Sequence, residues 1–330
     1  MARLLTLVAP SALLEGAPRD PAWLLEPFAV RGSAIMLYGR QGAGKSTLLL
    51  QLAHALAAGM PWLGFATAAP SGAVAYVNLD MPSEEFRALM SRAVASGVLD
   101  DNLLVTAEQA EFNVMRRADR EELASVLTVA DVRHVVVDTA PRTFEPAGGD
   151  VNAEVRRAVT LLQGLAPEGL LAFAQHDRKR GVYQKADDFE ADPDAFSGPA
   201  AWEATVTTSF RLTDREGKPK LWLQKHRLAD PGFRYLELAR DEFGFFHAKP
   251  HYAIALRSWP RMVPPKERFT PSSLKDVFED VARRANIDWK TVERYFYRTR
   301  KDGVYYGWAE ELVKKGASNE NEPATATDTD

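Results

Sequence analysis

Eight consecutive residues constrain this chain more than any other segment. They are Gly39-Arg40-Gln41-Gly42-Ala43-Gly44-Lys45-Ser46, and they match the pattern G-x-x-x-x-G-K-[ST] in full. An apolar run at 34–38 precedes them and a helix-like run at 47–56 follows. A phosphate-binding loop needs this context, because a strand must deliver it and a helix must begin behind it for backbone N–H groups to converge on the anion. The alternative, a glycine-rich turn that binds nothing, does not explain these flanks.

The residue types in this segment indicate what the loop would bind. Glycine lets the backbone approach phosphate oxygens without a Cβ in the way. The Lys45 ammonium would reach the β- and γ-phosphates, and the Ser46 hydroxyl would enter the Mg²⁺ shell. No Asn-Lys-x-Asp run for guanine recognition occurs, so we expect ATP with Mg²⁺. The expected nucleotide-binding residues of the loop are Gly39, Arg40, Gln41, Gly42, Ala43, Gly44, Lys45, Ser46 and Thr47.

The composition excludes several classes of protein. With 46% hydrophobic and 26% charged residues, the 330-residue chain is typical of globular proteins with one large or two unequal domains. No stretch approaches the roughly 18 apolar residues of a membrane span, and Pro10 interrupts the apolar start of the chain, so we expect a cytoplasmic protein without a membrane partner. The absence of cysteine excludes disulfides and thiolate metal sites. Because the net charge is −4, any contact with nucleic acid must rest on local basic patches.

Apolar runs alternate with segments of helical periodicity in the first part of the chain. Strands are expected at 72–80, 132–138 and 169–175, and helices at 84–95, 120–130 and 152–165. This alternation predicts an α/β fold with a mostly parallel sheet covered by helices on both faces. Short strands at 204–212, 220–225, 233–238 and 244–248, with a tight turn at 215–218, are expected to continue the sheet in antiparallel fashion.

The composition also divides the chain into four parts. Residues 1–249 form the expected ATPase domain, and residues 250–269 form a proline-containing linker. A compact helical domain is expected at 270–316. The remaining residues, 317–330, form an acidic tail with no apolar residue larger than alanine, which we expect to be disordered.

Two carboxylates follow expected strands, at the sheet edge where an open α/β fold gathers its site. Asp138 ends the apolar run 135–137 and is expected to bind the nucleotide's Mg²⁺ together with Ser46. Thr139 stands where many ATPases carry a catalytic glutamate. Asp80 is therefore the candidate general base that activates water. The alternative is that Asp80, or Ser83, caps the helix that follows.

The order of these motifs resembles a known family. The phosphate loop, the segment Asn78-Leu79-Asp80-Met81-Pro82-Ser83-Glu84-Glu85, the Asp138 strand and the pair Gln175-His176 occur in the order found in RecA-like ATPases. The chain is most similar to the plasmid RepA-type replicative helicases and their AAA-family relatives, and the opening segment 21–28 shares this likeness. The resemblance extends over residues 20–248 and implies a RecA-like P-loop NTPase core.

The resemblance also implies catalytic roles. In the family, the acid that ends the second strand is usually glutamate and acts as the base; here it is Asp80, one methylene shorter. Gln175 and His176 match the position that senses the γ-phosphate. Lys225 and Arg227 match the Lys-x-Arg that enters the neighbouring subunit's site in ring-forming members, where cations supplied in trans stabilise the transferring phosphoryl group. The alternative for this pair is a solvated basic turn.

Two basic segments are candidates for DNA contact. RecA-like proteins place strand-tracking loops directly after the sensor strand, where cations would grip phosphates and an aromatic ring would stack on a base. The residues concerned here are Arg178, Lys179, Arg180, Tyr183 and Lys185. The segment 274–308 is similar to a winged helix-turn-helix, with candidate DNA-binding residues Lys290, Arg294, Arg298 and Arg300 and a hairpin wing at 302–308. The alternatives are a solvated loop and a helical accessory domain that contacts a protein.

Together these features predict an ATP-hydrolysing ring, expected to be a homo-hexamer, that acts on single-stranded DNA. The most concrete expectation is a replicative helicase of a plasmid, phage or other mobile element, with duplex DNA as a further partner of the C-terminal module. Two alternatives stay open. One is a recombinase-like or loader ATPase that does not unwind DNA, and the other is an ATP-gated regulator that binds DNA through the winged helix.

Overall fold

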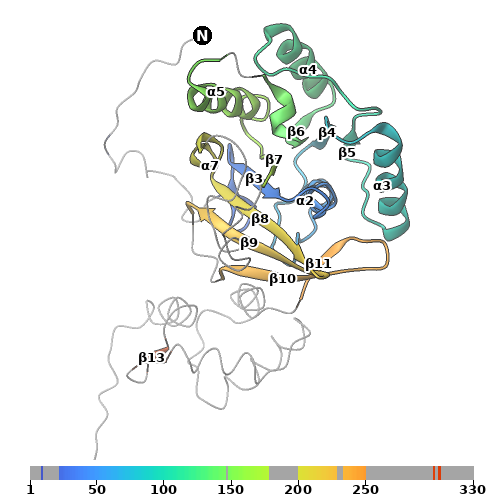
Figure 1. Ribbon diagram of the computed structural model, residues 1–330, viewed down its shortest axis with the longest axis vertical. Helices are drawn as coiled ribbons and strands as arrows, with labels where there is room; N and C mark the ends of the chain where they lie inside the picture. Colours follow the sequence, from blue (N-terminus) through green and yellow to red (C-terminus); the bar gives the residue numbers. More distant parts are fainter. Residues whose placement is uncertain are drawn as a thin grey trace, which may run out of the picture.

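The computed structural model describes residues 9, 22–145, 148–177, 200–228 and 233–249, together with the backbone of 300–301 and 304–305. Its main element is a nine-stranded sheet in the order β11-β10-β9-β8-β3-β7-β6-β4-β5 (Figure 1). Six neighbouring strands are parallel: β8 (Thr208–Arg215), β3 (Ala34–Gly39), β7 (Leu171–His176), β6 (Val132–Asp138), β4 (Ala73–Asn78) and β5 (Leu103–Val105). Three antiparallel strands extend the sheet: β9 (Lys218–His226), β10 (Tyr235–Arg240) and β11 (Phe246–Ala248). The predicted mostly parallel sheet with an antiparallel continuation is confirmed.

Helices cover both faces of this sheet. One face packs against α2 (Lys45–Ala58) and α3 (Ser83–Ser96), and the other against α4 (Arg117–Val129), α5 (Val151–Gln163) and the short α7 (Ala201–Thr205). Within β3, Ile35 and Leu37 contribute to the first core while Met36 and Tyr38 contribute to the second. A parallel strand buried on both faces must be apolar throughout, which explains the continuous apolar runs in the sequence. None of the helices described here is both long and apolar enough to cross a membrane.

The segment 204–212 differs from the prediction of a single strand. Residues Ala201–Thr205 form α7 and β8 begins only at Thr208. The buried Trp202 explains the difference, because its ring packs against Phe144 and Phe173 with centroid distances of 5.8 and 5.6 Å. A helical turn places this large ring on the sheet, where it buries far more apolar surface than the edge of a strand would.

Short elements complete the described part of the chain, and the sequence did not predict most of them. The strands β1 (Trp23–Leu25) and β2 (Ala29–Val30) form an antiparallel pair, and the 3-10 helix η1 (Ala140–Thr143) follows β6. These elements, like β5, have two to four residues, too few for a periodicity to be recognised.

The C-terminal third is described only at one hairpin. β12 (Arg300–Lys301) pairs antiparallel with β13 (Val304–Tyr305), at the start of the expected wing. The rest of the expected linker, helical domain and tail lies outside the described residues. The winged helix-turn-helix therefore stays a prediction.

Candidate active site

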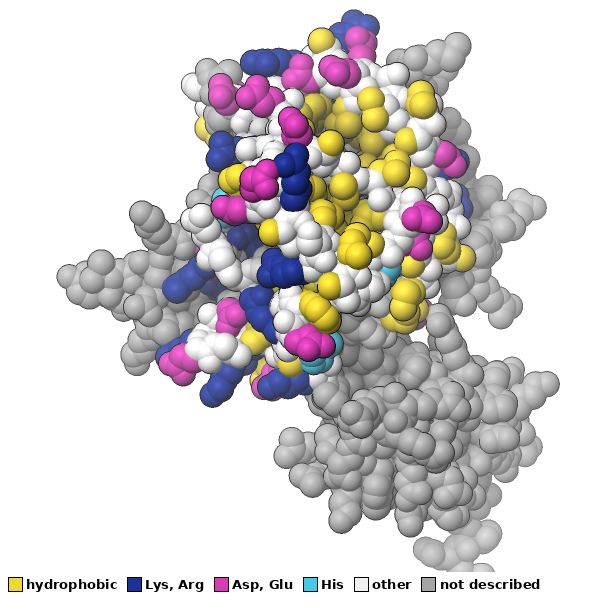
Figure 2. Space-filling model, turned by 90° about the vertical axis from the view of Figure 1, so that its right-hand side faces the viewer, with side chains coloured by type: hydrophobic (Ala, Val, Ile, Leu, Met, Phe, Trp, Pro, Cys, Tyr) yellow, Lys and Arg dark blue, Asp and Glu magenta, His cyan; other side chains and the backbone are white. Residues whose placement is uncertain are grey.

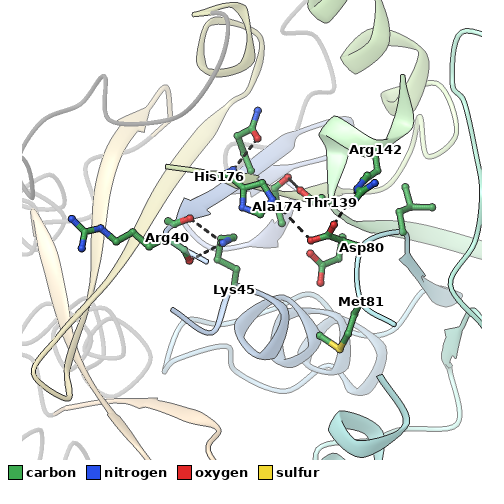
Figure 3. Close-up of polar contacts among 12 residues, drawn as sticks. Arg40, Lys45, Asp80, Met81, Thr139, Arg142, Ala174 and His176 are labelled. Carbon is green, nitrogen blue, oxygen red and sulfur yellow. Dashed lines mark hydrogen bonds and ion pairs between the residues drawn. The ribbon is translucent and has the colours of Figure 1, made fainter. Parts of the chain in front are cut away.

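The sheet order brings the phosphate loop, Asp80, Asp138 and His176 to one edge. β7 lies between β3 and β6, so the strand ending in His176 stands between the phosphate loop and Asp138. Gly39 is in register with His176, and Asn78 is in register with Asp138. Because these strands are parallel, their carboxyl ends meet at the same edge. Figure 3 shows Lys45, Asp80, Thr139 and His176 grouped there.

The phosphate loop leads directly into a helix, as the motif predicts. α2 begins at Lys45, and its N-cap residue Gly44 has a left-handed backbone with φ of 102°. The first turn of α2 carries no acidic side chain. The positive end of the helix dipole and its N–H groups therefore face a site without a competing carboxylate from the helix itself.

Lys45 is folded back onto its own loop. Its Nζ donates hydrogen bonds of 2.9 Å to the carbonyl oxygens of Gly39 and Arg40 (Figure 3). Burial lowers the pKa of Lys45, while the charges of Asp138, Asp177 and Asp80 raise it. To reach a phosphate, the ammonium would have to leave these two carbonyls.

Asp138 lies on β6 with a side chain that is 5% exposed. The Tyr76 hydroxyl donates a hydrogen bond of 2.8 Å to its Oδ2, and the Ser46 side chain also hydrogen-bonds to the carboxylate. Burial raises the pKa of Asp138, whereas these two hydrogen bonds and the charge of Lys45 lower it. A hydroxyl and a carboxylate in contact form an oxygen donor set that suits Mg²⁺, which takes one or two protein ligands beside phosphate and water. The residues fit the predicted metal role of Ser46 and Asp138.

Asp80 does not cap a helix. The N-cap position of α3 is Pro82 and no side chain accepts a capping hydrogen bond there, so the capping alternative is wrong for both Asp80 and Ser83. Asp80 instead accepts a hydrogen bond of 3.1 Å from Arg142 Nε, and its Oδ2 lies 4.0 Å from His176 Nε2 (Figure 3). The side chain is 36% exposed, so water can reach this carboxylate.

Gln175 and His176 differ in what they face. Gln175 is buried, and its Oε1 accepts a 2.8 Å hydrogen bond from the backbone N–H of His176. The partly exposed His176 ring lies near Asp80. Burial, together with the charges of Lys45 and Arg142, lowers the pKa of His176 against the opposing effect of the carboxylates. The lowered pKa favours the neutral imidazole, and the Gln175 side chain holds the backbone N–H of His176.

Three further residues of the site were not singled out from the sequence: Tyr76, Arg142 and Arg211. Arg142 projects from η1 to Asp80. Arg211 on β8 forms a buried ion pair with Asp177, with 2.9 Å between Nη2 and Oδ2. Asp177 also donates its backbone N–H to Gly39 O, the carbonyl that Lys45 contacts. An arginine between the apolar residues Phe210 and Leu212 was the sequence signal for a buried charge partner.

Lys225 and Arg227 lie at the other end of the sheet. His226 is in register with Thr208, and Thr208 with Ile35. Ile35 precedes Gly39 by four positions, or about 13 Å of strand. Lys225 Nζ donates to Glu203 O and Arg227 Nη2 donates to Ala204 O at 2.8 Å, both near the C-terminal end of α7. These cations cannot serve the phosphate loop of their own chain.

A cavity of about 920 Å³ adjoins the site. Its apolar lining includes Val77, Leu79, Phe112 and Leu123, and Arg142 is part of the wall. On the face formed by α3, α4 and β5, hydrophobic side chains gather at the surface (Figure 2). Exposed members of this group are Val94, Leu104, Val105, Val126 and Val129.

The expected DNA contacts fall outside the described side chains. The structure does not describe Arg178, Lys179, Arg180, Tyr183, Lys185, Lys290, Arg294 or Arg298, and it describes only the backbone of Arg300. Their roles stay predictions.

The fold and this site define the class of the protein. A phosphate loop between a parallel strand and a helix, with an Mg²⁺-type carboxylate two strands away, is the core of a P-loop nucleoside triphosphatase. A family model described as the AAA domain matches residues 2–180, more than half of the chain, and the chain belongs to this family of ATPases. The family implies use of a nucleotide, typically with Mg²⁺. No curated protein matches the chain.

Proposed function

We propose that this protein is an ATP-hydrolysing ring motor that acts on single-stranded DNA, most concretely a replicative helicase of a plasmid, phage or other mobile element. One observation carries the ring. Lys225 and Arg227 match the family's Lys-x-Arg, yet they lie at the sheet end remote from their own phosphate loop. This position supports a role in trans, because a finger formed by this pair would have to act in the site of another subunit. A finger of this kind contributes about 10³–10⁵ to the rate of phosphoryl transfer.

The groups at the sheet edge suit hydrolysis. Lys45 would move from the carbonyls of Gly39 and Arg40 to the phosphates. Asp80 would accept a proton from the attacking water as its oxygen bonds to the γ-phosphorus and the bond to ADP breaks. Arg142 holds the Asp80 carboxylate, and His176 beside it would respond to the γ-phosphate. Mg²⁺ held by Ser46 and Asp138 would offset the phosphate charge.

The DNA-binding part of the proposal rests on the position of the basic loop. Residues 178–185 directly follow Asp177, which is bonded to the phosphate loop through Gly39 O. A movement of the phosphate loop on ATP hydrolysis would therefore shift Asp177, and Arg178 is the next residue in the chain. Single-stranded DNA would bind its cations and Tyr183. Lys290, Arg294, Arg298 and Arg300 would add duplex contact through the C-terminal module.

A complementation experiment tests the trans site. The Lys45→Ala variant keeps an intact finger, and the Lys225→Ala/Arg227→Ala variant keeps an intact phosphate loop. We expect each variant alone to hydrolyse ATP poorly and their mixture to recover activity. Lys218→Ala, an exposed lysine at the start of the same strand, is the matched control and should behave like the wild type.

The assay is repeated with and without single-stranded DNA, and the assemblies are viewed by electron microscopy. Closed rings with DNA-stimulated turnover and strand displacement support the motor. Equal turnover of all variants, with and without DNA, would overturn it. Filaments would indicate the recombinase-like alternative, and a duplex footprint without strand displacement would indicate the regulator.

A further inference from the structure

The strand pair β10–β11 is fixed to the helix that carries the phosphate loop. The Gln51 side chain on α2 donates from Nε2 to Phe246 O at 2.6 Å and accepts from Phe246 N at 2.9 Å on Oε1. An amide side chain that bonds both the N–H and the C=O of one residue fixes where that strand lies along the helix and how it is oriented. β11 is therefore held in place one to two helical turns from Lys45.

This docking places Arg240 of β10 against the phosphate loop. Its Nη2 donates to Ala43 O at 2.8 Å and contacts Asp214 Oδ2 at 3.1 Å. The guanidinium carbon lies 4.2 Å from the centre of the Phe246 ring. The guanidinium is thus held by a carboxylate and an aromatic face, the two partners that its planar shape suits best.

The contact with Ala43 determines where the next N–H group points. The peptide bond between Ala43 and Gly44 is trans, and in a trans peptide C=O and N–H point in opposite directions. Because the Ala43 carbonyl points to Arg240, the Gly44 N–H points away from it. At Gly44 a Cβ would come within 2.8 Å of the Phe246 ring, so β11 packs directly on the loop at this residue.

We propose that Arg240 is a positioning residue of the nucleotide site: by holding the Ala43 carbonyl, it keeps the Ala43–Gly44 turn in the orientation that presents the Gly44 N–H to the phosphates. This inference rests on the proposed use of the loop for ATP. The contacts of Arg240 are with the Ala43 carbonyl, Asp214 and the Phe246 ring, so we expect it to act on nucleotide binding through the shape of the loop. Replacing Arg240 should therefore change Kd and KM for ATP and leave the rate of the chemical step unchanged.

The test compares Arg240→Gln and Arg240→Lys with a control, Arg234→Gln. Arg234 is an exposed arginine just before the same strand. Affinity is measured with a fluorescent ATP analogue, turnover by steady-state kinetics and folding by thermal unfolding without nucleotide. We expect Arg240→Gln to raise Kd and KM about tenfold, the equivalent of one hydrogen bond to a charged donor, with little change in kcat. Arg240→Lys should restore part of the affinity, and the control should match the wild type.

A second variant protects the test against loss of folding. Asp214→Asn leaves Arg240 in place but weakens its anchor, and it should raise KM in the same direction by a smaller factor. Unchanged affinity in Arg240→Gln, or a fall in kcat at unchanged Kd, would overturn the inference. The variant Lys45→Ala distinguishes a failure of the positioning role of Arg240 from a failure of the proposed ATPase function. If the wild type binds no ATP analogue, the proposed function fails; if Lys45→Ala loses binding while Arg240→Gln keeps it, only the positioning role fails.

Discussion

The Tyr76 hydroxyl donates a hydrogen bond of 2.8 Å to Asp138 Oδ2 across two neighbouring strands, β4 and β6. Both side chains are buried, and the Tyr76 ring also stacks on Phe86 of α3 at 5.7 Å. The bond lowers the pKa of Asp138 against the effect of burial. Tyr76 thus favours the ionised form of the expected Mg²⁺ ligand and orients its carboxylate.

Replacing this tyrosine tests that relationship. Tyr76→Phe keeps the stacked ring and removes the hydroxyl, so the Mg²⁺ concentration for half-maximal ATPase activity should rise about tenfold, as for other partners of metal ligands. The acid limb of the pH–rate profile should move to higher pH, because the pKa of Asp138 rises. Tyr235→Phe, on a half-buried ring of β10, is the control. An unchanged Mg²⁺ dependence would contradict the prediction.

The role of Asp80 is tested by changing only its ability to accept a proton. Asp80→Asn should lower kcat by about 10² or more, the scale of general base catalysis, while ATP affinity is retained. Asp80→Glu, which matches the family's usual residue, should remain active. The exposed Asp101→Asn serves as a control. If Asp80→Asn turned over ATP like the wild type, another group would have to be the base.

The ion pair between Asp177 and Arg211 predicts a large effect on stability. Both side chains are almost fully buried, at 2% and 1% exposure. Asp177→Asn would remove the Asp177 charge from the buried guanidinium and should lower the free energy of unfolding by about 3–5 kcal/mol. Urea unfolding measures this, and the double variant Asp177→Leu/Arg211→Met should recover much of the loss. A single variant as stable as the wild type would show that the pair contributes little.

His134 predicts a pH dependence of stability. Its buried Nδ1 accepts a hydrogen bond from Leu170 N at 3.1 Å, and burial lowers its pKa from 6.5 to about 4. Because the unfolded chain binds this proton first, stability is present above the unfolded pKa and falls as the pH drops from 6.5 to 4. The loss between pH 7 and pH 5 should be about 2 kcal/mol. Urea unfolding at both pH values should show it, and it should be smaller in His134→Asn. An equal loss in that variant would assign the effect to other groups.

The elements predicted correctly are those whose signal is local. The loop 39–46 needs only its glycines, its lysine and its flanks, and the Val132–Asp138 strand is a continuous apolar run. The turn at 216–217 follows from Glu216-Gly217, whose φ angles are 54° and 73°. In each case the residues that specify the structure are neighbours in the chain.

The residues that were missed act through partners that are distant in sequence. Arg142 contacts Asp80 across 62 positions, Arg211 contacts Asp177 across 34, and Arg240 contacts Ala43 across 197. A side chain's type shows that it needs a partner, but strand order decides which partner it meets. The same holds for Trp202, whose packing against Phe144 and Phe173 places a short helix where the first residues of an expected strand were predicted.

The sequence by itself determined the phosphate loop, the carboxylates that end two strands and the alternation that forms a parallel sheet. Only the tertiary structure decided that Asp80 faces His176 and Arg142, and that Lys225 and Arg227 lie at the far end of the sheet. The physical reason is that local patterns fix which residues form strands and turns, whereas hydrogen bonds between strands fix their order and direction. That order places Lys45, Asp80 and Asp138 at one end of the sheet and Lys225 and Arg227 at the other.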